Sequence, residues 1–575
     1  MKLPVISREF LLVPSGRSLD ARARRLLLDT VALGVAGALF AQLFTAFLRL
    51  VDHLMLWGIA GYHPPGLPNE GGSPLEIIGP HGLWLVPVST TLGGLIVGLL
   101  AARFAPEAEG HGTDTVIRAF HRADGEMRAR IPFVKLIASA ITIGSGGSAG
   151  REGPMALITG GIGSVYATLT GRTGEERRLL LLVGMAAGLS AIFRSPIGAA
   201  LLAVEILYAD MEFEPGALLY TALGAIVAYA LNGMFVGWQP LFRFANLANQ
   251  VPGTLDHGWY VLLGVAAGLL ATVTPAIFYG THQWFQRLPI KPYLKPAIGG
   301  LLMGLLALAV PKVIGGGYGW MQQAIDGQLT LGVLAVLVVA KVVAMSLSVG
   351  SGGSGGVFAP TLFAGAMLGG AFAAIAHLPP APFVVVGMAA VFAGAAHVPI
   401  ATMMMVTEMT GGYTLLVPAT LAVILSYLVQ RRLSRHVKFR SMYEAQVESS
   451  ADSPAHHEHH LEIALQILRD RGFREDSAEG QRKLISQLRA GIPVELPGGR
   501  RLLVASLRPE SPFLGQTLAD AAVYLTMGDT SILSILRGEH MLAPRPDLIA
   551  ERGDRFILVA GTNSAAALEP HFTLW

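Results

Sequence analysis

Apolar runs without a charged side chain recur along the chain from residue 31 onward. Four of them have nearly the length that an α-helix needs to cross the core of a bilayer, about 20 residues. These four, with a shorter fifth that runs on past Lys341, occupy residues 31–48, 83–102, 216–236, 261–279 and 329–340. The pattern predicts a helical protein that crosses a membrane several times. Because such runs are so many, the alternative of a large soluble protein with buried helices fits poorly.

Between residues 135 and 207 the apolar segments are short and interrupted by glycine. We expect these segments to be too brief to cross a bilayer individually. Their exposed backbone groups must then line a cavity or lie inside protein, because lipid offers no hydrogen-bond partner. The polar connection 103–130 predicts one short helix, and the Gly- and Pro-rich residues 58–80 predict an irregular loop.

The chain repeats itself over long distances. Residues 135–154, KLIASAITIGSGGSAGREGP, return as residues 341–360, KVVAMSLSVGSGGSGGVFAP, with nine of 20 positions identical and no gap. Two further pairs stand in the same order, residues 183–205 with 386–408 and residues 106–112 with 311–317. An internal duplication with glycine-broken helices in matching places is typical of secondary transporters and related channels. We therefore expect two half-repeats, at about residues 26–236 and 258–431.

Composition agrees with a membrane protein. Of 575 residues, 52% are hydrophobic and 14% are charged, against about a quarter charged in soluble domains. The net charge of +3 is too small to indicate a nucleic-acid partner, and the absence of cysteine excludes a disulfide scaffold and thiol chemistry. The first residues do not resemble a cleavable signal peptide.

Basic residues flank the apolar region at both ends. Residues 1–25 form a polar lead-in with several arginines, and the segment RRLSRHVKFR follows the last apolar run at residues 431–440. The positive-inside rule then places both termini in the cytoplasm. We expect a multi-pass protein of a bacterial inner membrane.

The glycine-rich segments, GSGGS-x-G in both copies, predict the chemistry. Each precedes a helix with proline near its first turn, Pro154 or Pro360. Such a helix start leaves backbone N–H groups unbonded and carries the positive end of the helix dipole. Two starts aimed at one point would bind an anion without a buried basic side chain. Glu152 lies at the first start, so its carboxylate is expected to occupy the anion's place when charged and to leave it when protonated.

Two other interpretations concern the same segments. Glu152 is equally compatible with an ordinary acidic residue that stabilises a helix dipole. Lys135 and Lys341 lie inside apolar runs, where a side chain that reaches out to the membrane surface is the simple explanation, preferred for Lys341. The segments GGSAG (146–150) and GGSGG (352–356) match the nucleophile motif G-x-S-x-G, and GSGGSG (350–355) matches G-x-G-x-x-G. Since their flanks are membrane helices, a membrane-embedded serine hydrolase is only a remote alternative, and we expect no enzyme.

At these residues the sequence resembles the CLC family of chloride channels and proton/chloride exchangers. The resemblance rests on GREGP (150–154), GVFAP (356–360) and the tyrosine of SMYEAQ, Tyr443, and covers about residues 25–447. It implies an all-α polytopic membrane domain of two inverted half-repeats, within residues 26–447, that forms a homodimer and carries chloride and protons with no other cofactor. It also implies that Glu152 is the external gate and that Lys135 lies near the pathway. The anion-binding residues implied are His111, Gly112, Arg151, Gly153, Val357, Phe358 and Tyr443, with Tyr443 on the inner side.

Two departures from the family pattern bear on mechanism. The usual GSGIP is GHGTD here (110–114), so His111 stands where a serine commonly touches the anion. The backbone N–H of His111, or its ring, whose charge changes near neutral pH, would then contact the anion in place of the serine. The pair Glu205–Ile206 lacks the second glutamate that serves as internal proton donor in strongly coupled members. Glu205 recurs as Glu408 in the other half, which favours a structural role for both. Channel and exchanger are nearly balanced, with a slight preference for a pH-gated channel or weakly coupled transporter.

The chain changes character after residue 447. Residues 448–499 are expected to form a linker and a charged helical segment, and His456, His457, Glu458, His459 and His460 suggest either a metal site or, preferably, an exposed polar tract. Residues 500–575 alternate short strands with one helix, LADAAVYL. This part resembles the C-terminal subdomain of potassium-transport regulators (RCK-C, or TrkA-C), a small α/β domain. The resemblance implies a cytoplasmic regulatory domain that either only dimerises or also binds a small nucleotide.

Overall fold

The computed structural model describes residues 16–244, 257–435, 437–447 and 453, and the C-terminal residues 494–496, 500–508, 511–520, 530–537, 540–542, 544–551, 553–561 and 572–574. The chain separates into two compact units, Met1–Gln446 and Val447–Trp575. The first unit is helical apart from a two-stranded hairpin, and the second contains a sheet.

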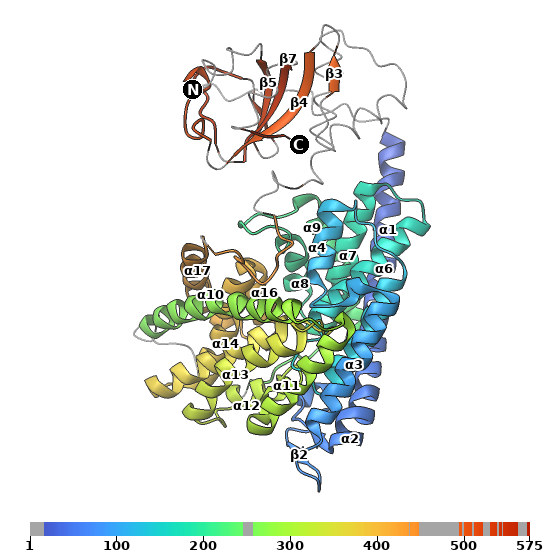
Figure 1. The fold of residues 1–575 in the computed structure, drawn as a ribbon, viewed down its shortest axis with the longest axis vertical. Helices are drawn as coiled ribbons and strands as arrows, with labels where there is room; N and C mark the ends of the chain where they lie inside the picture. Colours follow the sequence, from blue (N-terminus) through green and yellow to red (C-terminus); the bar gives the residue numbers. More distant parts are fainter. Residues whose placement is uncertain are drawn as a thin grey trace. The chain divides into compact units, whose positions relative to one another are not determined.

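The helices of the first unit fall into two series that correspond to the two sequence repeats (Figure 1). The first series is α1 (Gly16–Val51), α2 (Gly58–Ala60), α3 (Val86–Phe104), α4 (Thr113–Arg122), α5 (Arg130–Gly144), α6 (Glu152–Leu169), α7 (Gly174–Phe193), α8 (Pro196–Glu205) and α9 (Pro215–Val236). The second series is α10 (His257–Arg287), α11 (Lys295–Ala309), α12 (Tyr318–Ile325), α13 (Leu331–Val349), α14 (Phe358–Ala376), α15 (Pro380–Ala396), α16 (Pro399–Thr410) and α17 (Leu416–Ser434).

The prediction of a polytopic helical protein is confirmed. In the described part of the chain, eight helical segments are long and apolar enough to cross a membrane, and each of the five predicted apolar runs overlaps one of them. The polar connection contains the expected short helix, α4. The expected loop at residues 58–80 contains the short hairpin of β1 (Tyr62–His63) and β2 (Ile77–Ile78).

Two of the segments from 135 to 207 form longer helices than expected, although neither is among the described helices that are long and apolar enough to cross a membrane. Helices α6 and α7 have 18 and 20 residues. Their glycines do not break the helices but face the neighbouring helix: a Cβ on Gly163 would lie 2.2 Å from the Leu180 carbonyl oxygen, and one on Gly184 would lie 2.3 Å from that of Thr159. Small residues allow the two backbones to approach closely, as is common in membranes.

The same close packing recurs in the second half. A Cβ on Gly365 of α14 would lie 2.3 Å from the carbonyl oxygen of Gly387 in α15, and a Cβ on Gly387 would lie equally close to that of Gly365. The helix pairs α6–α7 and α14–α15 are therefore structural equivalents, as the duplicated sequence predicts.

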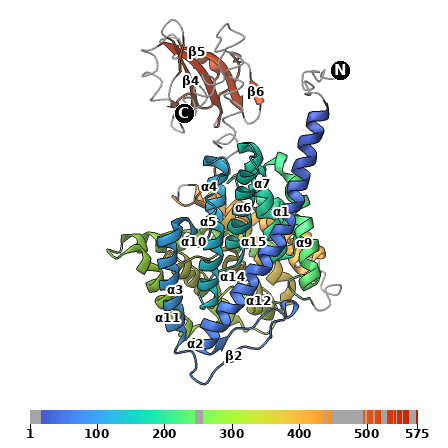
Figure 2. The same cartoon turned by 90° about the vertical axis from the view of Figure 1, so that its right-hand side faces the viewer.

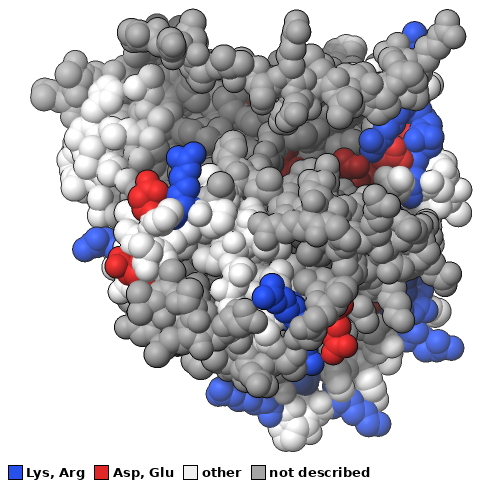
Figure 3. Space-filling view, turned by 90° about the horizontal axis from the view of Figure 1, so that it is seen from above, with Lys and Arg blue, Asp and Glu red and all other residues white. Residues whose placement is uncertain are grey.

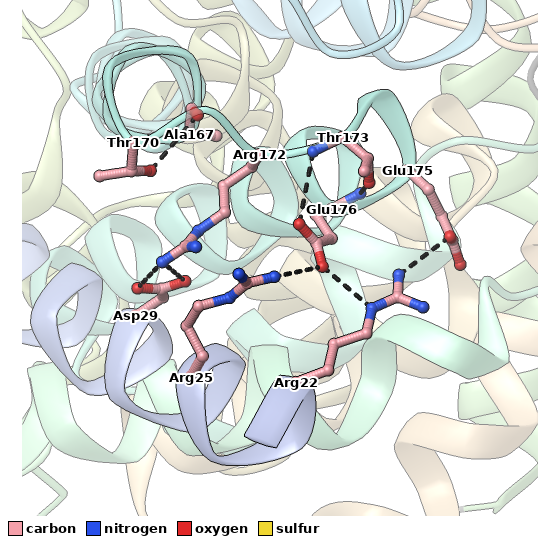
Figure 4. Close-up of polar contacts among 9 residues, drawn as sticks. All are labelled: Arg22, Arg25, Asp29, Ala167, Thr170, Arg172, Thr173, Glu175 and Glu176. Carbon is pink, nitrogen blue, oxygen red and sulfur yellow. Dashed lines mark hydrogen bonds and ion pairs between the residues drawn. The ribbon is translucent and has the colours of Figure 1, made fainter. Parts of the chain in front are cut away.

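Helix α1 is joined to the beginning of α7 by charged side chains (Figure 4). Arg22 and Arg25 donate to Glu176 at 2.9 and 3.1 Å, and Arg22 also reaches Glu175 at 3.1 Å. Asp29, nearly buried on α1, pairs with Arg172 at 2.8 Å. The exposed pairs contribute little to stability, but together they fix the position of α1, which runs along one side of the helical unit in both ribbon views (Figure 2).

The C-terminal unit is built on an antiparallel sheet with the order β3-β4-β7-β5-β6, with β8 also pairing β4. Its strands are β3 (Val494–Leu496), β4 (Arg500–Leu507), β5 (Thr530–Arg537), β6 (His540–Leu542), β7 (Arg555–Gly561) and β8 (Phe572–Leu574). Three strands expected from the sequence, LLVASL (502–507), TSILSILR (530–537) and RFILVAG (555–561), are confirmed as β4, β5 and β7. Apart from residues 518–520, at its start, the predicted helix LADAAVYL lies outside the described residues, as does the predicted helical segment 461–490.

Candidate functional site

Two helices, α6 and α14, begin at the place where the repeated glycine-rich segments meet. Gly150 and Gly356 exchange backbone hydrogen bonds in both directions, each at 2.7 Å. Glu152 and Phe358 are the first helical residues that follow. Gly146 and Gly352 take the equivalent positive φ angles of 106° and 104°, which glycine adopts without strain. The duplicated sequence therefore brings two helix N-termini together around a local twofold axis.

Side chains reinforce this junction symmetrically. The Ser148 N–H donates to the Ser348 hydroxyl at 2.9 Å, and the Ser354 N–H donates to the Thr142 hydroxyl at 3.2 Å. These are the same two positions of the repeat, with the halves exchanged. Among the described residues neither motif serine, Ser148 or Ser354, forms a hydrogen bond with a histidine, so the arrangement needed for a serine hydrolase is not formed there.

The Glu152 side chain is fully buried between these helix starts. Its Oε1 accepts a hydrogen bond from the Tyr318 hydroxyl, at the beginning of α12. Its Oε2 faces the backbone N–H of Ala359 in α14 without a hydrogen bond of normal geometry. The carboxylate thus lies where the positive ends of α6 and α14 converge.

A cavity of about 700 Å³ opens beside Tyr318. It is lined by residues of both halves, including Arg49, Asp52, His63, Glu70 and Arg151. The Arg151 guanidinium forms a bidentate pair with Glu70 at 2.5 and 3.2 Å.

The central carbon of the Arg151 guanidinium group lies 5.1 Å from the centre of the Tyr318 ring. The Arg151 side chain is therefore held by Glu70 and Tyr318, and its Nε lies 3.9 Å from Glu152 Oε1.

A second cluster surrounds His111. The centre of its ring lies 5.4 Å from that of Tyr443, edge to face. Tyr443 is 2% exposed, and Thr113 is its side-chain hydrogen-bond partner. The charge of Glu152 also acts on Tyr443 electrostatically. The structure thus brings Tyr443 and His111 toward the same region as Glu152.

Glycines allow the loops of this region to touch. A Cβ on Gly153 would lie 2.4 Å from the His111 carbonyl oxygen and 3.1 Å from the Cα of Gly356. Gly112 has a φ angle of 88°, and a Cβ there would lie 3.1 Å from the Gly153 carbonyl oxygen. Neither glycine has room for a side chain.

Val357 and Phe358 begin α14 and are 1% and 3% exposed. The Phe358 ring packs between Phe193 at the end of α7 and Phe392 in α15, with ring centres 4.9 and 3.7 Å apart. This packing fixes the start of the helix, so that its backbone N–H groups keep one direction.

Lys341 does not extend to a membrane surface, contrary to the preferred expectation. It is fully buried, and its Nζ donates to the carbonyl oxygens of Val313 and Gly315 at 2.8 and 2.6 Å. Lys135 does the same in the first half, with Ala108 and Gly110 at 3.0 and 2.7 Å. Each ammonium group satisfies carbonyl groups of the loop before a short helix, which compensates in part for its burial.

Glu205 and Glu408 each bind the start of the helix that carries the other: Glu205, in α8, binds the start of α16, and Glu408, in α16, binds the start of α8. Glu205 accepts from the backbone N–H groups of Ile400 and Ala401 at 3.0 and 2.6 Å, in the first turn of α16. Glu408 accepts from those of Ile197 and Gly198 at 3.2 and 2.8 Å, in the first turn of α8. Ile206 follows α8 and is 1% exposed.

Sequence reasoning missed three residues of this region: Glu70, Asp114 and Tyr318. Tyr318 follows the repeated segment 311–317 and so occupies the position of Thr113 in the first half, which is the signal that identifies it. Glu70 lies in an irregular loop, and no pattern marks it. Asp114 lies three residues after His111, a spacing that places two side chains on one face of a helix start. The histidines of the linker lie outside the described residues, and no group of metal-binding side chains was found in the part of the chain that is described.

Comparisons with known proteins agree with this geometry. Residues 93–431 match the family described as voltage gated chloride channel, and residues 502–573 match the TrkA-C domain. A putative chloride channel protein ClcB-like of Ralstonia nicotianae is 30% identical over 69% of this chain and 91% of its own length. The H(+)/Cl(-) exchange transporter ClcA of Salmonella gallinarum is 31% identical over 65% of this chain and 83% of its own.

Solved structures share the fold. A slow cyanobacterial Cl-/H+ antiporter superposes with a TM-score of 0.62 at 22% identity, covering 73% of this chain and 96% of its own. A CLC-type fluoride/proton antiporter gives the same TM-score at 20% identity, covering 74% of this chain and 98% of its own.

Proposed function

The chain belongs to the voltage-gated chloride channel (CLC) family, and from this premise we propose that it exchanges chloride for protons across a membrane. The observation that carries the proposal is the position of the Glu152 carboxylate, buried where the starts of α6 and α14 converge. A negative group is stable there because backbone N–H groups and helix dipoles favour it. Chloride requires the same environment, so carboxylate and anion compete for one place.

Protonation of Glu152 decides this competition. A charged carboxylate is held by the Tyr318 hydroxyl and by the convergent helix starts. A neutral carboxyl group has lost its attraction to them, and chloride can replace it on the N–H groups of residues 357 and 358. Each cycle would then move a proton with the glutamate and an anion through the place that it leaves. The cavity beside Tyr318, which opens to the same region, would be the external entrance.

The relatives favour exchange over a channel. Curated relatives at about 30% identity are named H(+)/Cl(-) exchange transporters, which supports the exchanger more than the pH-gated channel that the sequence slightly preferred. One observation still favours weak coupling. Ile206 cannot carry a proton, and both carboxylate oxygens of the adjacent Glu205 accept backbone hydrogen bonds. We therefore retain a weakly coupled transporter as the second candidate.

Reversal potentials across a pH gradient test the proposal. Purified protein in proteoliposomes with fixed chloride concentrations should show a reversal potential that moves with the pH gradient. A channel would keep the chloride equilibrium potential at every pH. A potential independent of the pH gradient would therefore reject exchange.

Replacement of the gate provides the matched variant. Glu152→Gln should remove proton coupling and make chloride flux largely independent of external pH, because glutamine cannot become charged. In the wild-type protein the neutral fraction of a single carboxyl group changes by up to about tenfold per pH unit. Glu126→Gln, whose glutamate side chain is 65% exposed, is the control. If chloride flux in Glu152→Gln keeps the pH dependence of the wild-type protein, Glu152 is not the gate.

We propose further that two copies form a dimer with both termini in the cytoplasm. Apolar side chains exposed on α9 and α17, among them Leu219 and Val417, provide a surface for a second copy or for lipid. Arginines at the beginning of α1 and the end of α17 support the cytoplasmic placement. Figure 3 shows both basic and acidic side chains among the described residues, so the placement rests on the arginines of α1 and α17. Cross-linking in membranes and labelling of terminal tags test both points.

The C-terminal TrkA-C domain is proposed to regulate transport, either by dimerisation alone or by binding a small nucleotide. Calorimetric titration of the full-length protein with a cyclic dinucleotide separates the two forms of the proposal. Heat of binding supports a nucleotide site, and no heat of binding supports dimerisation alone.

A further inference from the structure

The His111–Asp114 pair lies beside Tyr443, which the family resemblance places on the inner side of the anion pathway. His111 Nε2 is 3.1 Å from Asp114 Oδ2. The other carboxylate oxygen of Asp114 accepts from the backbone N–H of Ala445 at 3.1 Å. Asp114 is therefore held between α4 and the segment that carries Tyr443, and it holds the histidine ring in one orientation.

The second ring nitrogen of His111, Nδ1, is buried and has no hydrogen-bond partner. The His111 side chain is 7% exposed, and its ring lies against Tyr443 and Phe278, with ring centres 5.4 and 6.2 Å away. Buried polar atoms normally have partners. An unpartnered nitrogen beside the proposed anion pathway therefore suggests a ligand that binds there.

The charge of Asp114 decides which form of the ring this ligand meets. An ionised carboxylate only accepts hydrogen bonds, so the neutral imidazole must carry its proton on Nε2. Its Nδ1 then presents a lone pair, which repels an anion. When a second proton binds, Nδ1 becomes a donor while Nε2 keeps its bond to Asp114.

We propose that His111 and Asp114 form an inner proton-accepting site that takes up one proton together with one anion. The proposal rests on the exchange function proposed above and supplies a proton site at a place other than residue 206. In the uptake step an N–H bond forms at Nδ1, and the proton comes from hydronium or a buffer acid, whose conjugate base stays in solution. The anion then accepts a hydrogen bond from this new N–H group.

Charged and titratable groups from all sides act on this site. The charged groups next to this site are Asp114, Glu152, Glu444 and Lys135, and the Lys135 ammonium group is bound to the carbonyls of Ala108 and Gly110. The phenols of Tyr279 and Tyr443 complete the surroundings, and both interact electrostatically with Asp114. Side-chain exposure is 17% for Asp114 and 7% for His111, so water reaches the aspartate more readily.

Calorimetry of chloride binding to the detergent-solubilised full-length protein tests the inference. Measurements in the Glu152→Gln variant remove the competing carboxylate, and two buffers with different ionisation enthalpies give the number of protons taken up. We expect proton uptake that approaches one proton per chloride as the pH rises, and a chloride affinity that falls by up to about tenfold per unit of rising pH. The double variant Glu152→Gln/His111→Asn should take up no proton and bind chloride with the same affinity at every pH.

A second substitution predicts the opposite effect at high pH. In Asp114→Asn the side-chain oxygen stays on the Ala445 N–H, so the amide NH₂ group faces His111 Nε2 and donates to it. The neutral ring then carries its proton on Nδ1 and can bind the anion without a further proton. In the Glu152→Gln background we expect tight chloride binding that persists at high pH.

The control is His121→Gln, which removes a buried histidine of α4, the helix that follows His111; its ring contacts the Leu207 carbonyl oxygen. It should leave proton uptake unchanged. Binding to Glu152→Gln without proton uptake, or equal uptake in the His111→Asn double variant, would overturn the inference. The reversal-potential experiment judges the exchange function separately, so failure of either proposal can be recognised. If the His111→Asn protein does not fold, the Asp114→Asn result alone decides.

Discussion

At the scale of single residues, the contact between Tyr318 and Glu152 is the feature most directly tied to the proposed gate. The tyrosine hydroxyl donates to the carboxylate, so it stabilises the charged form of Glu152 more than the neutral one, which is a weaker acceptor. The Tyr318 ring in turn supports the Arg151 guanidinium, which is paired with Glu70. Glu152 and its neighbour Arg151 are thus held by contacts from two segments distant in sequence, at Tyr318 and Glu70.

Tyr318→Phe should shift the pH dependence of transport. Loss of a hydrogen bond to a charged group costs about 1.5–3 kcal/mol, and about 1.4 kcal/mol corresponds to one pH unit. Because the charged carboxylate loses this stabilisation, protonation occurs at higher pH, and we expect half-maximal chloride flux about one to two units higher. Flux from proteoliposomes at stepped external pH measures it, with Tyr413→Phe at an exposed position as control. An identical profile in Tyr318→Phe would mean that the bond does not govern the gate.

At the scale of elements, glycines decide how closely the helix pairs α6–α7 and α14–α15 approach. Both pairs place a helix start at the proposed anion site, so their spacing sets the position of the convergent N–H groups. The reciprocal contact of Gly365 and Gly387 leaves no room for a methyl group on either side.

Gly365→Ala should therefore destabilise the protein, whereas Gly280→Ala should not. Overpacking of a tight contact costs about 1–3 kcal/mol, and we expect a lower unfolding temperature and reduced chloride flux. Gly280 lies within α10 with no atom near its missing side chain, so alanine there removes only the conformational penalty of glycine, about 1 kcal/mol. Thermal unfolding in detergent compares the two. Equal unfolding temperatures would show that the helices can separate without loss.

At the scale of the whole molecule, the proposed anion pathway lies entirely within the first unit, Met1–Gln446. The last residues of the first unit contribute to that proposed pathway. The Gln446 side chain donates to the carbonyl oxygens of Ile206 and Ala396 at 3.0 and 3.1 Å, and Met442 N–H donates to Ala395 at 2.8 Å. The segment after α17 therefore closes the region around Tyr443.

Truncation should separate transport from regulation. A chain that ends after residue 447 keeps every described contact of the first unit, and we expect it to retain chloride flux of the same order as the full-length protein. A chain that ends after residue 434 loses Tyr443 and Gln446, and its flux should fall to background. Flux per reconstituted protein, together with gel filtration, measures both. Loss of flux in the longer truncation would show that the C-terminal domain is required for transport itself.

The sequence predicted much of the architecture because its signals are local or repeated. Apolar runs mark helices by length alone, and the duplicated GSGGS-x-G segments mark two helix starts that must correspond. The same local view underestimated the lengths of α6 and α7, because glycine weakens an isolated helix but permits close packing between two helices. It also misjudged Lys341, because the carbonyl groups that bind its ammonium lie near residue 314, beyond the reach of any periodic pattern.

By itself the sequence determined the family, the two half-repeats and the acidic residue at the first helix start. Only the tertiary structure decided which groups surround that residue. Tyr318 is 166 positions from Glu152, and Glu70 is 81 positions from Arg151. Hydropathy and helix-start signals arise from neighbours along the chain, whereas these contacts arise from packing of the two halves against each other. The same packing brings Ala445 to Asp114, and so orients the histidine on which the proposed inner proton site depends.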